Sequence, residues 1–351
     1  MNILSISISL ARVEFGLFKK GSGAIAPCKK INGWMKFGDL GSVADKIAGE
    51  VSCGFGLLPD HACVRIPYGG REFGESNAPA DDESFARLAK ISHSAPLHIP
   101  HIIALCKELK RRFNGVSFSF AVETAFFSAL PEREVNYAIS DNAVPGMPFR
   151  RTGHHGLFHE SAYRSIFEKR RYTASEKVVS VCLEPVPEIA AIVGTCPVMV
   201  TGGATPLEGL PGETTCGEID PFIVLNLSKK FGWGPEQINN ILTKKSGILG
   251  LTGKRMQLDR LLSRSSRKYD PAKKIFVYKL TQSCGAAAAA MGGADFIVFS
   301  GRYASAGRRY CRSASLVLRF WIVGVLLFRF FCCTLPTAKV RLSTPMRPFA
   351  S

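Results

Sequence analysis

Apolar and polar residues alternate along the first part of the chain in a way that predicts a sheet followed by helices. The strands expected are residues 3–10 (ILSISISL), 13–20 (VEFGLFKK) and a continuation near 24–31, with helical spacing at 84–91 and 99–113. A longer apolar run, residues 116–127 (VSFSFAVETAFF), suits a buried strand.

The same order of elements occurs again further along the chain. Three consecutive strands are expected at 176–184, 188–194 and 196–202, then helices at 220–232, 234–245 and 272–293, and a closing strand at 294–301. Asp220 and Pro221 have the residue types of an N-cap and a first helical position. This pattern predicts a duplicated α/β arrangement with a cleft between its halves and ligands at the strand ends.

The net charge of +17 is concentrated at the C-terminal end. Residues 301–351 contain eight Arg, one Lys and no acidic residue, so the other 300 residues carry only the remaining +8. That value does not require a polyanionic partner, and no nucleic-acid-binding motif accompanies it. We therefore expect neither nucleic acid nor membrane as a partner.

Eleven cysteines without CxxC spacing indicate free thiols in a reducing compartment, and hence a cytoplasmic protein. The N-terminus has no basic segment before its apolar residues, so export is not expected. The most apolar stretch, FWIVGVLLF at 320–328, is shorter than the roughly 20 residues that span a bilayer.

After Gly301 the composition changes abruptly to Arg, Ser, Cys and Phe without periodicity. Residues 302–351 are open to three interpretations: a basic membrane-associating tail, a further domain, or translation in a wrong reading frame. The lack of acids and of any helix or strand pattern favours the third.

Seven stretches of the chain occur in an order that resembles the acetate kinase family. They are VRIPYGGREF (64–73), APLHIP (95–100), FAVETAFFSALPE (120–132), RRTGHHGLFH (150–159), TPLEGL with CGEIDP (205–221), KKSGILGLTG (244–253) and GAAAAAMGGADFIVFSG (285–301). They are similar to the family segments HRVVHGGxxF, APLHNP, VFDTAFHxTMP, RxYGFHGxSH, TPLEGL–DP, KSGLLGxSG and the approach to FTGGIGEN.

The resemblance implies two actin-like ATPase (ribonuclease H-like) domains, each βββαβαβα, around an interdomain cleft. We expect an N-terminal domain at 1–125 on the substrate side, a second domain at 126–301 on the nucleotide side, and a non-homologous tail at 302–351. The implied protein is a homodimer that transfers the γ-phosphoryl of ATP, with Mg²⁺, to acetate or a similar short-chain carboxylate.

Such a transfer brings two anions together, so it depends on positioning and on neutralisation of charge. Arg65 matches the family's substrate-carboxylate arginine, and its forked guanidinium suits a planar carboxylate. Glu123 stands where the family has a catalytic Asp, with one methylene more. Leu97 and Pro206 match apolar positions of the acyl pocket.

His155 matches the family histidine that donates to the phosphoryl group in the transition state. His154 and His159 flank it, and of these only His159 matches a family histidine. With no Cys or acid at ligand spacing, this cluster is not expected to bind a metal.

The first departures from the family fall in the N-terminal hairpin. The family motif NxGSSSxK aligns with residues 7–14, where Ser7 replaces the asparagine that helps hold Mg²⁺ and Glu14 replaces the lysine. Arg12 is a candidate substitute for the lost cation only if the hairpin shifts.

Further departures fall on the nucleotide side. The phosphate loop HLGNG aligns with Cys182–Val186, where Pro185 offers no amide and Glu184 adds a negative charge. A like charge at ~4 Å costs about 4 kcal/mol at an effective dielectric of 20. Thr215 stands where the family has the arginine that stabilises the transition state. The resemblance to the nucleotide-contacting loop GGIGEN ends at Arg302. The metal-binding Glu that follows this loop in the family is absent.

Two functions therefore remain open. The chain is either an acetate kinase-type phosphotransferase or an inactive relative: a carboxylate-binding or dimer-scaffolding protein, or the product of a decaying gene.

Overall fold

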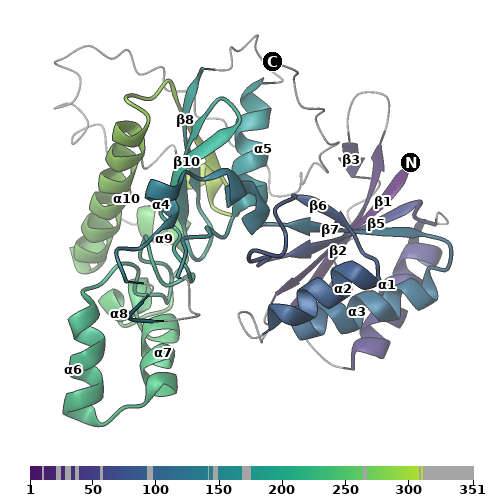
Figure 1. The fold of residues 1–351 in the computed structure, drawn as a ribbon, viewed down its shortest axis with the longest axis horizontal. Coiled ribbons are helices and arrows are strands. Elements are labelled where there is room, and N and C mark those ends of the chain that lie inside the picture. The colour runs from purple at the N-terminus through teal and green to yellow at the C-terminus, as the bar shows by residue number, and fades with distance from the viewer. Residues whose placement is uncertain are drawn as a thin grey trace. The chain divides into compact units, whose positions relative to one another are not determined.

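The chain forms two compact units in the computed structural model (Figure 1). The structure describes residues 1–9, 12–20, 25–27, 33–35, 39–55, 58–92, 98–140, 142–144, 149–167, 175–263, 267–307 and 310. The first unit contains Met1–Ser128, and the second begins at Ala129.

A mixed sheet forms the centre of the first unit, with strand order β3-β2-β1-β5-β7-β6 and β4 beside β2. The strands are β1 (Asn2–Ser9), β2 (Arg12–Lys20), β3 (Ile25–Pro27), β4 (Gly33–Met35), β5 (His61–Ile66), β6 (Asn77–Pro79) and β7 (Ser117–Val122). The predicted N-terminal hairpin is confirmed by the antiparallel pairing of β1 with β2. In contrast, β1, β5 and β7 run parallel to one another.

Helices of the first unit gather on one face of this sheet (Figure 1). They are α1 (Leu40–Phe55), α2 (Asp82–Lys90) and α3 (Ile99–Arg112); α1 and α2 both contact α3. The predicted strand 116–127 was too long, because β7 ends at Val122 and a 3₁₀ helix covers Thr124–Ala129. The apolar residues after Val122 are buried by this turn rather than by strand pairing.

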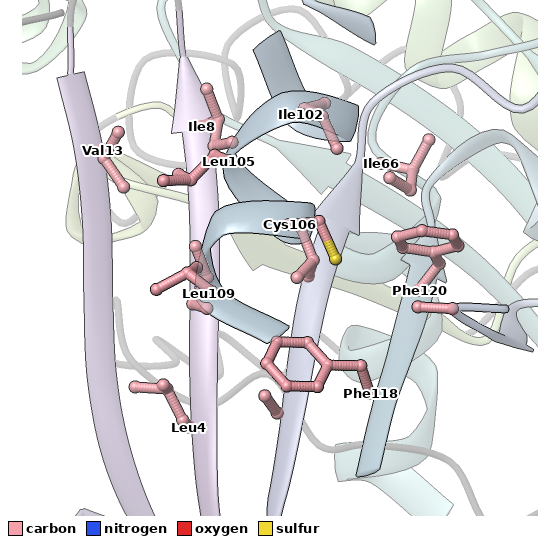
Figure 2. Close-up of a cluster of buried hydrophobic side chains, with 14 of the residues drawn as sticks. Leu4, Ile8, Val13, Ile66, Ile102, Leu105, Cys106, Leu109, Phe118 and Phe120 are labelled. Atoms are coloured by element: carbon pink, nitrogen blue, oxygen red, sulfur yellow. The ribbon is translucent and has the colours of Figure 1, made fainter. Parts of the chain in front are cut away.

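Apolar side chains from β1, β5 and β7 meet those of α3 in a single core (Figure 2). Leu105 of α3 and Phe120 of β7 are both fully buried. The ring of Phe120 meets the ring of Phe85 edge-on at 5.6 Å between centroids, a favoured aromatic geometry. This packing fixes the carboxyl ends of β5 and β7 relative to each other.

The second unit is built on a four-stranded sheet in the order β10-β9-β8-β11. Its strands are β8 (Lys177–Cys182), β9 (Glu188–Val193), β10 (Cys196–Val200) and β11 (Phe296–Ser300). The helices are α4 (Glu132–Val135), α5 (Gly156–Phe167), α6 (Pro221–Phe231), α7 (Pro235–Lys244), α8 (Gly247–Thr252), α9 (Leu258–Ser263) and α10 (Asp270–Ala290), with 3₁₀ turns at Arg267–Tyr269 and Ala304–Ala306.

Helices α10 and α5 cover opposite faces of this sheet (Figure 1). Successive strand residues point to opposite faces, so Val179 and Val181 join the α10 core while Ser180 faces α5. All predicted strands and helices of this half are confirmed, including Asp220, whose carboxylate accepts the amide hydrogen of Phe222 at 2.8 Å.

Residues just beyond Gly301 also belong to the core of the second unit. Tyr303, Ala304, Ala306 and Tyr310 are buried, and the Tyr310 ring packs on Phe299 with 5.9 Å between centroids. Residues 311–351, most of the predicted tail, lie outside the described residues. Among the described helices, none has the length and apolarity that crossing a membrane requires.

Replacing Leu105 with Ala should lower the free energy of unfolding of the first unit by about 2–5 kcal/mol, because it leaves a cavity under the sheet. The same change at Leu58, which is 65% exposed, should have little effect. Urea unfolding of both variants tests this; equal losses would contradict the assignment of Leu105 to the core.

Candidate functional site

Arg65 and Glu123 meet at the ends of two parallel strands. Arg65 lies in β5, and Glu123 follows β7 directly and donates its amide hydrogen to the Ile66 carbonyl at 2.9 Å. The Arg65 Nε donates to Glu123 Oε1 at 2.5 Å. The Glu123 side chain is 1% exposed and that of Arg65 28%, so the guanidinium both neutralises a buried carboxylate and reaches solvent.

Ser7 of β1 is the third member of this group. Its Oγ accepts a hydrogen bond of 3.3 Å from Arg65 Nη1. β1 is the parallel neighbour of β5, so the sheet order alone brings residue 7 beside residue 65. The position at which the resembled motif has asparagine is therefore a second contact of the arginine.

His98 extends the group and was missed by sequence reasoning, although it lies within the quoted stretch APLHIP. It precedes α3 as the N-cap residue. Burial lowers the pKa of His98, and the charges of Arg65 and His101 lower it further. His98 therefore lies within electrostatic range of the Arg65 cation. The predicted pocket residue Leu97 lies outside the described residues.

In the second unit, a buried carboxylate holds the histidine turn. Glu188 begins β9 and is 2% exposed. Its two carboxylate oxygens accept the amide hydrogens of His154 and His155, each at 2.9 Å. These amides precede the first turn of α5, where a negative charge is stabilised by the helix dipole.

The turn before α5 sets which groups the side chains of His155 and His159 contact. His155 Nε2 lies 2.9 Å from the Val186 carbonyl oxygen, and since a carbonyl only accepts, Nε2 carries the hydrogen. His159 is fully buried, with Nδ1 2.8 Å from Ser180 Oγ and Nε2 3.3 Å from Glu188. The predicted catalytic histidine therefore contacts the backbone of the Cys182–Val186 loop.

Glu188 is held in its ionised form. Burial by itself would raise the pKa of its carboxyl group, but the hydrogen bond from His159 and the charges of the three histidines outweigh burial and lower the pKa to about 2. Sequence reasoning also missed this residue; the signal was a single acid at the start of the apolar run EIAAIVG.

Two glycines before TPLEGL make room for two carboxylates. A Cβ atom at Gly202 would lie 1.9 Å from Glu188 Oε2, and one at Gly203 would lie 1.8 Å from Glu208 Oε2. Glu208 in turn pairs with Arg151 Nη2 at 2.6 Å. The segment is thus an ordered loop, in which Pro206 is exposed; its role in an acyl pocket stays a prediction.

The departures predicted on the nucleotide side converge at one edge of the second sheet. β8 and β11 are parallel neighbours, so the loops after them meet. The Glu184 carboxylate accepts the Arg302 amide hydrogen at 2.6 Å and lies 3.7 Å from Arg302 Nε. Gly212 connects this edge to Thr215: its amide hydrogen is donated to the Thr215 carbonyl at 3.0 Å.

The Cys182–Val186 loop has no amide hydrogen at Pro185, so its backbone fits the phosphates of ATP less well than a glycine loop would. The loop directs carbonyl groups at its neighbours: Pro185 accepts from the Glu213 amide at 2.8 Å and Leu183 from the Tyr303 amide at 2.9 Å. Phosphate binding instead requires amide donors and cations. In the part of the chain that the structure describes, no group of three or more His, Cys, Asp or Glu residues is placed to hold a metal ion.

Comparison with known proteins agrees with this arrangement of elements. The model of the acetokinase family matches residues 60–316. This chain belongs to the acetokinase family. An acetate kinase of Thermosipho africanus is 34% identical over 242 residues, which are 67% of this chain and 59% of that protein. An acetate kinase of Dictyoglomus thermophilum is 32% identical over 257 residues, 72% of this chain and 63% of that protein.

Solved structures of the family have the same fold. Acetate kinase of Porphyromonas gingivalis superposes with a TM-score of 0.78 at 21% identity, covering 90% of this chain and 87% of that one. A propionate kinase of Francisella tularensis gives 0.78 at 21% identity, with 90% and 88% covered. The predicted actin-like ATPase fold is confirmed. The sequence matches span less than two thirds of the curated relatives' length.

Replacing Glu188 with Gln should lower the free energy of unfolding at pH 7 by about 3 kcal/mol, because it removes a buried, paired charge. The folded-state pKa is below the ordinary 4.5, so the stabilisation by Glu188 is complete above pH 4.5 and is lost as the pH falls toward 2. Thermal unfolding across this range should be less pH-dependent in Glu188→Gln than in the wild type. Glu236→Gln, an exposed change on α7, is the control and should leave the acid dependence unchanged.

Proposed function

We propose that this chain is an acetate kinase-type protein that binds a short-chain carboxylate, such as acetate or propionate, at Arg65. The observation that carries the proposal is the contact of Arg65 with Glu123 at 2.5 Å, with Ser7 Oγ as a second partner of the guanidinium. The buried Glu123 fixes the guanidinium in place, and the exposed part of Arg65 provides the cation for a ligand carboxylate.

We further propose that phosphoryl transfer from ATP is lost or slowed by about 10³-fold or more. Thr215 supplies no charge where the family has its transition-state arginine, and removal of such a cation costs about 10³–10⁵ in rate. The carbonyl-lined loop at Cys182–Val186 adds to this loss. The chain would then still bind the carboxylate substrate, while transferring phosphate slowly or not at all.

Full acetate kinase activity with ATP and Mg²⁺ is the second candidate function. The observation in its favour is Arg302, whose side chain is 46% exposed beside the Cys182–Val186 loop. A guanidinium at that place offsets the negative charge of Glu184 and is chemically suited to a phosphate.

Replacing Arg65 with Ala should weaken acetate binding by about 10–150-fold, since a hydrogen bond to a charged group contributes about 1.5–3 kcal/mol. Calorimetric titration of acetate and propionate measures the affinity, and Arg71→Ala, a change at an exposed arginine, should leave it unchanged. Equal affinities of wild type and Arg65→Ala would refute the site. A hydroxamate assay with ATP, Mg²⁺ and acetate separates the two candidates: Arg65-dependent turnover at the rate of a family enzyme favours the second.

We also propose that two copies of the chain associate through α6. No residue of this helix is buried, yet Phe222, Ile223, Leu225 and Phe231 are between 46% and 62% exposed. A pocket of about 320 Å³ lies nearby, lined among others by Pro211, Leu251 and Ile275. Such an apolar surface is typical of an interface.

A second copy is the occupant because the charges along α6 are self-complementary. Asp220 precedes the helix, while Lys229 and Lys230 lie in its last turn. Two α6 helices packed antiparallel across a twofold axis place the acid of each copy opposite the lysines of the other. The apolar residues between them then meet.

Replacing Leu225 with Glu should convert the dimer to a monomer in sedimentation experiments, because it places two buried carboxylates in the twofold interface. Leu58→Glu, which adds the same charge at an exposed position of the first unit, should leave the dimer intact. Association of Leu225→Glu as strong as that of the wild type would exclude α6 as the interface.

We propose a reducing, cytoplasmic setting, which is supported by free cysteines among the described residues, including the exposed Cys196. Burial raises the pKa of Cys63 and of Cys106 to about 12, which keeps both groups as unreactive thiols.

A further inference from the structure

The turn after β11 is tied to the loop after β8 by contacts that satisfy polar groups of both. The Tyr303 amide donates to the Leu183 carbonyl at 2.9 Å, and Tyr303 Oη donates to Glu213 Oε1 at 2.7 Å. Gly301 permits this approach, since it has a φ of 85° and a Cβ there would lie 2.8 Å from the Leu183 carbonyl oxygen.

Glu184 and Arg302 form an ion pair at the same edge, between the loop after β8 and the turn after β11. Glu184 receives the Arg302 amide on one oxygen at 2.6 Å and faces Arg302 Nε with the other at 3.7 Å. The Glu184 side chain is 13% exposed and that of Arg302 46%. The carboxylate is therefore the more enclosed partner, and it holds the more exposed guanidinium next to the loop after β8.

A carboxylate that accepts both a backbone amide and a guanidinium contact makes the contacts that a phosphate oxygen would make at this edge. The other acid here, Glu213, is buried and bound to Tyr303. Because the Arg302 guanidinium already faces the Glu184 carboxylate, the pair adds no net positive charge that would attract a polyphosphate.

We propose that Glu184 is an internal anion that occupies Arg302 and keeps nucleoside polyphosphates out of the loop edge between β8 and β11. The chain's own carboxylate takes the place of a phosphate group. The proposal concerns the second unit alone and does not depend on carboxylate binding at Arg65.

The test is calorimetric titration of ADP, without metal, into the whole chain and three variants. The wild type and Arg302→Ala should show no saturable binding at millimolar ADP. Glu184→Gln keeps a hydrogen-bond acceptor for the Arg302 amide but removes the negative charge, so it should bind ADP saturably, about tenfold or more tighter than the lower limit on Kd set by the wild type. Glu184→Gln combined with Arg302→Ala should lose that gain, and Glu236→Gln serves as the matched control for removal of an exposed acid.

Two results would overturn the proposal. One is wild-type ADP binding as tight as that of Glu184→Gln; the other is a folded Glu184→Gln variant with no gain. Thermal unfolding of the same variants checks that the second unit, which carries the substitutions, is folded. Acetate titration separates this proposal from the carboxylate site, because absence of acetate binding in all of the proteins, including the wild type, concerns Arg65 alone and leaves the ADP result valid.

Discussion

Parallel pairing of neighbouring strands is the constraint on which the chemistry of this chain depends. Parallel strands end at the same edge of a sheet, so residues far apart in sequence are brought together without any local signal. In the first unit the pairing of β5 with β7 places Arg65 beside Glu123. In the second, the pairing of β8 with β11 places Glu184 beside Arg302.

Glu123 in the first unit and Glu188 in the second are both buried carboxylates, and their charges are compensated differently. Glu123 is neutralised by a guanidinium, a full charge on a side chain that still reaches solvent. Glu188 is compensated mainly by backbone amides and by histidines. Both arrangements satisfy the requirement that a buried charge be paired or hydrogen-bonded. They differ in consequence: in the first, part of the guanidinium is exposed to solvent, whereas the second fixes the turn that carries His155.

At the edge formed by the loops after β8 and β11, polar groups of the chain pair with one another. Glycines allow the close approach of the backbone here, since a Cβ at Gly301 or at Gly212 would lie 2.8 Å or 2.5 Å from a carbonyl oxygen of the loop after β8. Side chains now complete the contacts internally, through Arg302 and Tyr303. An edge that satisfies its own polar groups gains stability and has fewer groups to offer to an external anion.

The sequence by itself determined the family, the order of elements and the residues that match its motifs, because strand alternation, helix caps and ordered motifs are local. It also located Arg65, Glu123 and His155. Tertiary structure decided what those residues contact. Glu188 is one acid in an apolar run until the turn before α5 folds over it, and Arg302 is the first residue of an anomalous tail until β11 pairs with β8. Contacts between residues 118 positions apart are set by sheet pairing and by the burial of charge, and neither is visible in a stretch of sequence.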